Sequence, residues 1–242
     1  MTTGTAVLAV VLVAVNVWVH VGPSRTHLVT GPLAALVLLV VGRLEGLTWE
    51  QLGLGLEQLP AGLVVGLAGA AVIAVVISLG LVLPVTRTAF LDTRYDVDGR
   101  TALRTALITI PLSTVVFEET AFRAVVWGLL ERASGGAAAT LVSSALFGVW
   151  HVLPALDVVV TSAALRGRTT GRGGRAGVRV LVVLGAVAGT ALAGVALAGL
   201  RWWTGSLIAP VLVHAAANGC AVLASSRAWA RLRASGGSSA LA

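Results

Sequence analysis

The stretch Phe117-Glu118-Glu119-Thr120-Ala121-Phe122-Arg123 places three ionisable side chains within an otherwise apolar segment. Residues 108–116 before it and 124–130 after it carry no charge. A charged side chain at the centre of a bilayer costs at least ~2.5–3.5 kcal/mol on insertion scales, so ionisable residues in such segments usually serve a function. We therefore expect other parts of the chain to bring polar side chains to the same depth.

The composition predicts an all-α, polytopic membrane protein. The chain has 242 residues, of which 57% are hydrophobic and 11% are charged, whereas soluble proteins typically contain ~25% charged residues. The expected partner is the lipid bilayer. Nucleic acid is not expected despite the formal charge of +7, because no soluble domain is present to carry a basic surface. The single Cys220 excludes an intramolecular disulfide and a cysteine-based metal cluster.

Seven apolar runs predict a bundle of about seven (six to eight) membrane-spanning helices. A spanning helix needs ~20 predominantly apolar residues, and the first two runs are shorter than that. The fourth and fifth runs are long, and we expect them to tilt, to extend past the bilayer, or to break near Pro111 and Pro154. The runs cover residues 6–21, 28–42, 61–83, 103–130, 137–165, 178–200 and 203–224.

The arginine residues predict the orientation of the bundle. All 17 basic residues are arginine. If the seven spans alternate in direction, 13 arginines lie in loops on one side, Arg123 lies within the membrane, and the other side receives only Arg43, Arg132 and Arg201. Cytoplasmic loops carry an excess of Lys and Arg. This distribution predicts a multi-pass protein of the cell (plasma) membrane with a cytoplasmic C-terminus. No basic residue precedes the first apolar run, which is therefore interpreted as a retained helix rather than a cleaved signal peptide.

Helical geometry divides the opening stretch into two parts. Glu119 and Arg123 are four residues apart on one helix face, with the acid N-terminal to the base, which favours an ion pair that offsets much of the cost of burial. Glu118 is turned by about 100° around the helix and faces elsewhere, which leaves its carboxylate free for chemistry. In the alternative interpretation, all three side chains form one buried ionic brace.

Two later apolar runs each carry a histidine with a second side chain four residues away. These pairs are Phe147 with His151 and His214 with Asn218. A lone histidine in an apolar helix is more often a satisfied core residue than a catalyst, and Asn218 could simply join two helices. Together with Glu118, however, the pairs would supply a base, two imidazoles and an amide at one depth. These groups suit hydrolysis.

The three motifs, EExxxR at residues 118–123, FxxxH at 147–151 and HxxxN at 214–218, resemble the CAAX-protease and bacteriocin-processing family of intramembrane endopeptidases, prokaryotic relatives of the prenyl-protein protease. They occur in the family's order within residues 111–223. The resemblance implies that Glu118 and His151 face each other and activate the attacking water. It also implies that His214 and Asn218 stabilise the oxyanion. The supporting side chains would then be Glu119, Arg123 and Phe147.

The resemblance leaves the role of a metal open. Members of this family have long been called metalloproteases, and a glutamate-dependent mechanism without a metal has also been argued. A zinc ion could be bound by Glu118, His151 and His214, since two histidines and one carboxylate are a typical set for hydrolytic zinc. A metal-free site would use the same residues.

The leading hypothesis is an intramembrane endopeptidase that cleaves a membrane-associated peptide or protein. The alternatives are a proton-coupled transporter, in which intramembrane Glu and His form a proton relay, and a catalytically silent scaffold or immunity protein. The chain is predicted to comprise N-terminal membrane helices with an interfacial linker (1–60), a catalytic transmembrane core (61–225) and a disordered cytoplasmic tail (226–242). In the linker, residues 47–54 are expected to lie in the membrane interface, anchored by Trp49. The basic, glycine-rich loop at 166–175 is expected to be flexible.

Overall fold

The computed structural model describes residues 3–161 and 172–235, and these form an all-α bundle without β-strands. The predicted fold class is therefore confirmed. The helices of the bundle are α1 (Thr3–Val21), α2 (His27–Leu44), α3 (Leu59–Val82), α4 (Gly99–Arg104), α5 (Val116–Glu119), α6 (Trp127–Trp150), α7 (Val152–Thr161), α9 (Arg172–Thr204) and α10 (Ile208–Ala234). Short 3-10 turns are η1 (Ser24–Thr26), η2 (Leu56–Gln58), η3 (Arg87–Phe90) and η4 (Thr93–Tyr95), and π-helical segments are η5 (Thr105–Thr109), η6 (Pro111–Val115) and η7 (Thr120–Val126).

Six helical stretches of the described chain are long and apolar enough to cross a membrane, and the longest, Gly99–Trp150, folds back on itself. As a straight helix its 52 residues would measure about 78 Å, more than twice the thickness of a hydrocarbon core. The backbone leaves the helical region at Gly135 (φ 80°, ψ 164°). The ring of Phe122 then packs 5.3 Å from that of Phe147. This hairpin divides the stretch into two packed arms, and the six stretches agree with a bundle of about seven (six to eight) spans.

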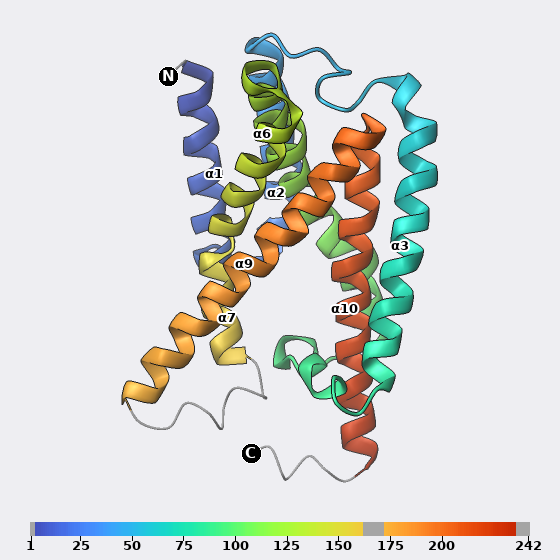
Figure 1. Cartoon of the computed structure of the whole chain (residues 1–242). Helices are drawn as coiled ribbons and strands as arrows, with labels where there is room; N and C mark the ends of the chain where they lie inside the picture. Colours follow the sequence, from blue (N-terminus) through green and yellow to red (C-terminus); the bar gives the residue numbers. More distant parts are fainter. Residues whose placement is uncertain (1–2, 162–171, 236–242) are drawn as a thin grey trace.

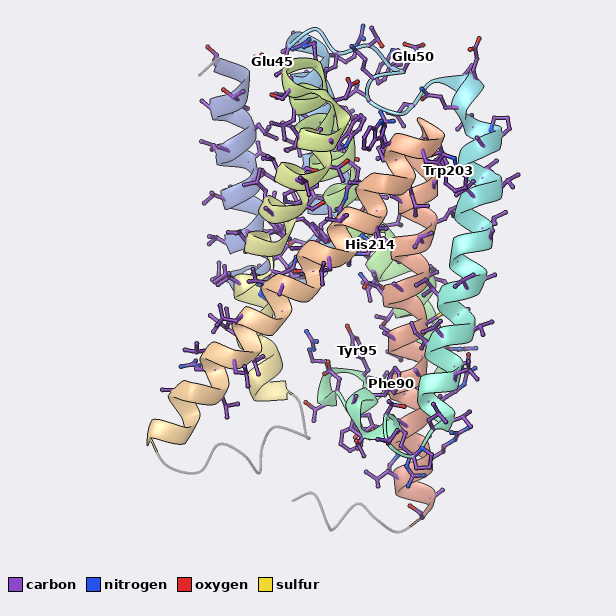
Figure 2. All side chains as sticks on the ribbon, viewed as in Figure 1. Glu45, Glu50, Phe90, Tyr95, Trp203 and His214 are labelled. Carbon is purple, nitrogen blue, oxygen red and sulfur yellow. The ribbon has the colours of Figure 1, made fainter. Side chains whose placement is uncertain are left out.

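The two termini of the chain lie at opposite ends of the bundle (Figure 1). Figure 2 shows Glu45 and Glu50 near the end that holds the N-terminus, Phe90 and Tyr95 toward the opposite end, and His214 between them. The ionisable His214 is therefore placed at an intermediate depth of the bundle.

Of the two predicted breaks, the one near Pro154 is present, whereas the chain near Pro111 stays helical. The run at 137–165 is interrupted at His151 (φ −85°, ψ 7°), where α6 ends, and Pro154 follows in the first turn of α7. The proline is tolerated there because the first turn of a helix has no partner for its backbone N–H groups. At Pro111 the chain stays helical but changes to π-helical geometry in η6. π-helical segments often occur at functional sites.

The C-terminal boundary of the bundle differs from the prediction. Residues 226–234, expected to begin a disordered tail, continue helix α10. They are ordered because the segment between α3 and α4 packs against them: Ser226 Oγ donates to the Val97 carbonyl (2.9 Å), and Trp229 Nε1 donates to that of Asp92 (2.8 Å). Residues 236–242 of the predicted tail and residues 162–171, with most of the predicted basic loop, lie outside the described residues.

The linker at 47–54 packs into the bundle. Leu47 and Leu52 are fully buried, and Arg201 of α9 donates from Nη2 to the Gln51 carbonyl (2.8 Å). The guanidinium of Arg201 also lies 4.8 Å from the ring centroid of Trp127. Trp49 is 48% exposed, and its position in the membrane interface stays a prediction.

We expect the Gly135→Ala variant to lose about 1–3 kcal/mol of stability, because the backbone conformation at Gly135 is essentially restricted to glycine. The measurement is the midpoint of thermal unfolding in detergent, followed by circular dichroism. Gly185→Ala is the matched control, since a Cβ atom at Gly185 would meet no atom within 4 Å and its φ is not positive. Equal midpoints for the two variants would contradict the assignment of the hairpin turn to Gly135.

Candidate active site

A buried ion pair between Glu119 and Arg123 forms the base of the polar cluster. The side chains are 0% and 1% exposed, and Nη1 of Arg123 donates to Oε1 of Glu119 at 3.1 Å. The predicted pair is therefore present. The Arg123 guanidinium also lies 4.0 Å from the ring centroid of Phe147, an arrangement that a cation–π interaction stabilises. Its Nη2 atom donates to the Gly194 carbonyl of α9 at 3.5 Å.

The same carboxylate oxygen of Glu119 bonds to His214 of α10. The distance from Nδ1 of His214 to Oε1 of Glu119 is 2.7 Å. An ionised carboxylate can only accept hydrogen bonds, so Nδ1 carries the hydrogen. The other ring nitrogen, Nε2, faces Glu118 and lies 3.8 Å from its Oε2 atom. Glu119 thus determines the orientation of the imidazole and the nitrogen that it presents to Glu118.

Glu118 is oriented by a residue that the sequence motifs did not indicate. The indole Nε1 of Trp150 donates to Oε1 of Glu118 at 3.0 Å. Oε2 of Glu118 is buried and has no hydrogen-bond partner among the described residues. No described hydrogen bond or ion pair joins Glu118 to His151, and the activation of one water by both side chains stays a prediction. The described partners of Glu118 are Trp150 and His214.

His151 lies where α6 ends, close to the cluster but in a separate contact. Its Nδ1 atom is 2.8 Å from the carbonyl oxygen of Phe147. Because a carbonyl oxygen only accepts, Nδ1 carries the hydrogen and Nε2 remains available as a base or acceptor. The Phe147 ring, which is 2% exposed, has its centroid 4.5 Å from that of His151 and 5.9 Å from that of His214. Phe147 thus packs against both imidazoles.

Asn218 lies four residues after His214 on α10, and its side chain is partly exposed. The part of the chain that the structure describes provides no hydrogen-bond partner for its amide. A primary amide has two donor hydrogens and one acceptor oxygen. Asn218 can therefore offer donors to a ligand without first breaking an internal bond.

Asn16 connects the first helix to this site. Its Nδ2 atom donates to the carbonyl of Trp150 at 3.0 Å, and Trp150 in turn donates to Glu118. The sequence contained weak signals for both residues: Asn16 is a polar residue in an apolar run, and Trp150 is a tryptophan within a predicted span. An indole N–H buried in an apolar region requires a partner, but a sequence does not show which partner it finds.

The predicted zinc ligands do not form a metal site. Among residues 3–161 and 172–235, no three His, Cys, Asp or Glu side chains are arranged to hold a metal ion. A hydrolytic zinc site typically has three protein ligands at about 2.0–2.2 Å. Glu118 and His214 face each other, whereas the only described hydrogen bond of His151 is to Phe147. The set Glu118, His151 and His214 therefore does not fit a bound zinc ion in this arrangement.

The family comparison covers the same region of the chain. The model of the Rce1-like family, which is described as type II CAAX prenyl endopeptidase Rce1-like, matches residues 101–220. This range contains every side chain of the three motifs. No curated protein and no solved structure matches the chain.

We expect Arg123→Ala to destabilise the protein by about 3–5 kcal/mol, because it leaves the fully buried Glu119 without its partner. The measurement is the decrease in the midpoint temperature of thermal unfolding in detergent. Arg94→Ala is the control: the Arg94–Asp92 pair has a similar separation, 2.7 Å, but is partly exposed, and exposed pairs contribute about 0–1 kcal/mol. A midpoint for Arg123→Ala as high as that of Arg94→Ala would show that the buried pair does not support the fold.

Proposed function

Residues 101–220 belong to the Rce1-like family of type II CAAX prenyl endopeptidases, and from this membership we propose that the chain is an intramembrane endopeptidase whose attacking water is activated by Glu118. The family supports a peptidase at the general level. The roles of individual side chains, the cleavage of a membrane-associated peptide or protein and the independence of a metal are the specific parts of the proposal.

The observation that carries the proposal is the unpartnered Oε2 atom of Glu118 opposite Nε2 of His214. A buried carboxylate oxygen without a hydrogen bond is costly, and one water molecule would satisfy it. The separation of 3.8 Å is too long for a direct hydrogen bond, and a bridging water fits such a separation. Both contacts of this water would be groups that can accept a proton, as the nucleophile of a hydrolase requires.

The reaction then follows from the positions of these groups. Glu118 Oε2 accepts a proton from the water as its oxygen forms a bond to the carbonyl carbon of the scissile peptide. The carbonyl π bond breaks and its oxygen becomes an oxyanion. The oxyanion then re-forms the carbonyl as the C–N bond breaks, and Glu118 gives the proton to the leaving nitrogen. Atoms and charges balance without another reactant. Trp150 keeps the carboxylate in place by bonding only its other oxygen.

The remaining side chains supply donors for the oxyanion. We assign this role to Asn218 through its amide hydrogens, and to His214 through Nε2 when that nitrogen carries a proton. Glu119 supports His214 in either state, because Nδ1 donates to it at 2.7 Å. His151 presents Nε2 as a second base at the end of α6. Its contribution is expected to be smaller than that of Glu118, because no described contact joins it to the Glu118–His214 pair.

The proposed substrate is a peptide segment that reaches the interior of the membrane. The cluster lies on helices that are apolar enough to span, and His214 lies between the two ends of the bundle (Figure 2). A low-dielectric site strengthens the hydrogen bonds to a developing oxyanion. We place the protein in the cell membrane with the arginine-rich, C-terminal end in the cytoplasm, on the basis of the positive-inside rule.

We expect Glu118→Gln to reduce peptide hydrolysis by about 10²–10⁴-fold, because glutamine keeps an acceptor for Trp150 but cannot take a proton. Hydrolysis is measured in proteoliposomes with a pool of membrane-anchored, internally quenched peptides. Glu57→Gln, at an exposed position of η2, is the control and should retain the parent rate. Unchanged hydrolysis by a folded Glu118→Gln variant would overturn the assignment of the base. Proton-coupled uptake without hydrolysis would instead support the transporter alternative.

Metal removal tests the second specific part of the proposal. Every step above uses a side chain of the protein. We therefore expect the hydrolysis rate to stay within about twofold of its original value after chelation and dialysis, which corresponds to a change in activation free energy of less than about 1.4 kcal/mol. The metal content of the purified protein is measured in parallel. A loss of activity that is restored only by added zinc would overturn the metal-free proposal. The role of Glu118 would then be decided by the Glu118→Gln variant.

A further inference from the structure

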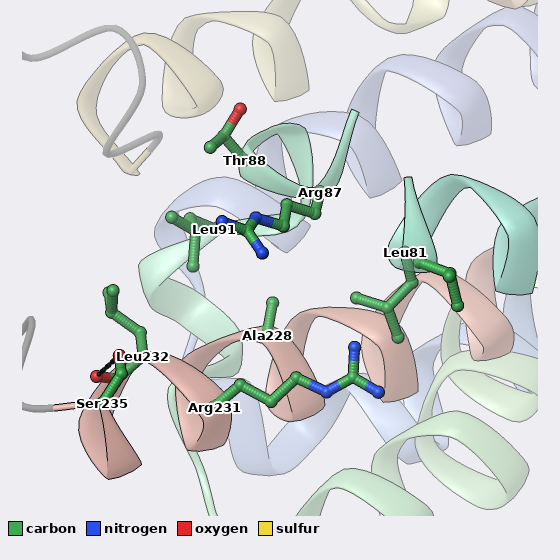
Figure 3. A pocket seen from close by; sticks show the side chains of 9 residues that line it. Leu81, Arg87, Thr88, Leu91, Ala228, Arg231, Leu232 and Ser235 are labelled. Atoms are coloured by element: carbon green, nitrogen blue, oxygen red, sulfur yellow. Dashed lines mark hydrogen bonds between the residues drawn. The ribbon is translucent and has the colours of Figure 1, made fainter. Parts of the chain in front are cut away.

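A cavity lies far from the polar cluster, at the C-terminal end of the bundle. It has a volume of about 380 Å³ and is formed by the end of α3, the turn η3 and the last turns of α10. Its two charged lining residues are both arginines, Arg87 and Arg231, and none of its lining residues is acidic. Figure 3 shows the two side chains with Ala228 between them. We refer to this cavity as the basic pocket.

The two arginines of the basic pocket form no described ion pair, unlike two of the other arginines at the same end. At the same end, Arg94 pairs with Asp92 at 2.7 Å, and Arg233 pairs with Asp96. Neither Arg87 nor Arg231 forms an ion pair among the residues whose side chains the structure describes, which lie within 3–156 and 176–235. A cation in the last turn of a helix is favourable because it interacts with the negative end of the helix dipole. That effect accounts for Arg231 but not for a second arginine facing the same cavity.

The walls of the basic pocket are held by the folded chain rather than by a free loop. Three hydrogen bonds and one ion pair attach the segment between α3 and α4 to α10, among them Trp229 Nε1 to the Asp92 carbonyl (2.8 Å) and Ser226 Oγ to the Val97 carbonyl (2.9 Å). At the other wall, Thr86 Oγ1 donates to the Gly80 carbonyl at the end of α3 (2.6 Å). The two guanidinium groups are therefore presented by a preformed cavity.

An apolar furrow on α3 continues from the basic pocket. It is lined by Ala74, Val75, Ser78, Leu79 and Val82, and Val82 also lines the basic pocket. The larger side chains of the furrow are 57–67% exposed in the isolated chain, as is expected for a face in contact with hydrocarbon. Because α3 ends at Val82, the arginines lie where this apolar face meets the aqueous boundary.

We propose that the basic pocket and the furrow together bind one anionic phospholipid, with its phosphate between Arg87 and Arg231 and an acyl chain along α3. Guanidinium groups bind phosphate oxygens through paired, charge-assisted hydrogen bonds, and basic pockets between membrane helices bind anionic headgroups. A peptide in the act of cleavage is the less suitable occupant. Arg231 lies 17 residues after His214 on α10, which corresponds to about 26 Å along the helix.

The test compares two charge-matched double variants. Arg87→Gln/Arg231→Gln removes the pocket arginines, and Arg100→Gln/Arg104→Gln removes two exposed arginines of the same end that do not line the pocket. Native mass spectrometry measures the dissociation constants of phosphatidylglycerol and phosphatidylcholine. We expect the parent to bind one phosphatidylglycerol selectively. The pocket variant should bind it at least tenfold more weakly, since hydrogen bonds between charged groups are the strong ones. The control variant should bind it as the parent does.

Two further probes separate a lipid from other anions. Ala74→Phe fills the furrow. It should weaken the binding of long-chain phosphatidylglycerol but not the binding of dihexanoyl phosphatidylglycerol. Inorganic phosphate and an acidic peptide should compete only weakly with phosphatidylglycerol for the basic pocket. The proposal is overturned if the two double variants bind equally, or if phosphate or the peptide binds as tightly as the lipid. If the pocket variant unfolds, the single variants Arg87→Gln and Arg100→Gln provide the same comparison. Failure of this test leaves the hydrolysis assay of Glu118→Gln unaffected, because neither arginine belongs to the polar cluster.

Discussion

The site depends on one carboxylate oxygen. Oε1 of Glu119 accepts from Arg123 at 3.1 Å and from His214 at 2.7 Å, and thereby joins η7 to α10 in a fully buried position. A charge at this depth is tolerated only when it is paired and hydrogen-bonded. Glu119 satisfies that requirement for Arg123 and also selects the nitrogen that His214 presents to Glu118. The support of the fold and the orientation of the candidate catalytic groups are therefore the same interaction.

The hairpin at Gly135 brings the aromatic side chains of α6 against the buried ion pair. It returns the chain so that Phe147 and Trp150 pack against the helix that carries Glu118 and Arg123, with Phe117 and Trp150 at 5.6 Å and Phe122 and Phe147 at 5.3 Å between ring centroids. These aromatic contacts exclude water from the ion pair and position the indole that bonds to Glu118. Within a membrane, where apolar burial gives little preference for one helix pair over another, such packing and polar contacts determine how helices associate.

The two ends of the molecule have different chemistry. Toward one end, Arg201 is buried against Trp127 and bonds the linker that joins α2 to α3. At the other end, two arginines pair with aspartates, and the two arginines of the basic pocket form no described ion pair. The polar cluster lies between these ends. An enzyme of this design would keep peptide chemistry separate from its contacts with lipid headgroups.

The sequence by itself determined the all-α fold, the presence of several apolar helices long enough to span a membrane and the Glu119–Arg123 pair, because apolar length and four-residue spacing are local properties. It also identified the motif residues, through the resemblance of three spacings. Only the tertiary structure decided which groups meet: Glu118 contacts Trp150 and His214, Asn16 reaches the site from the first helix, and α10 continues to Ala234. These contacts join residues up to 134 positions apart. They depend on helix packing and on the turn at Gly135, which periodicity within one helix does not specify.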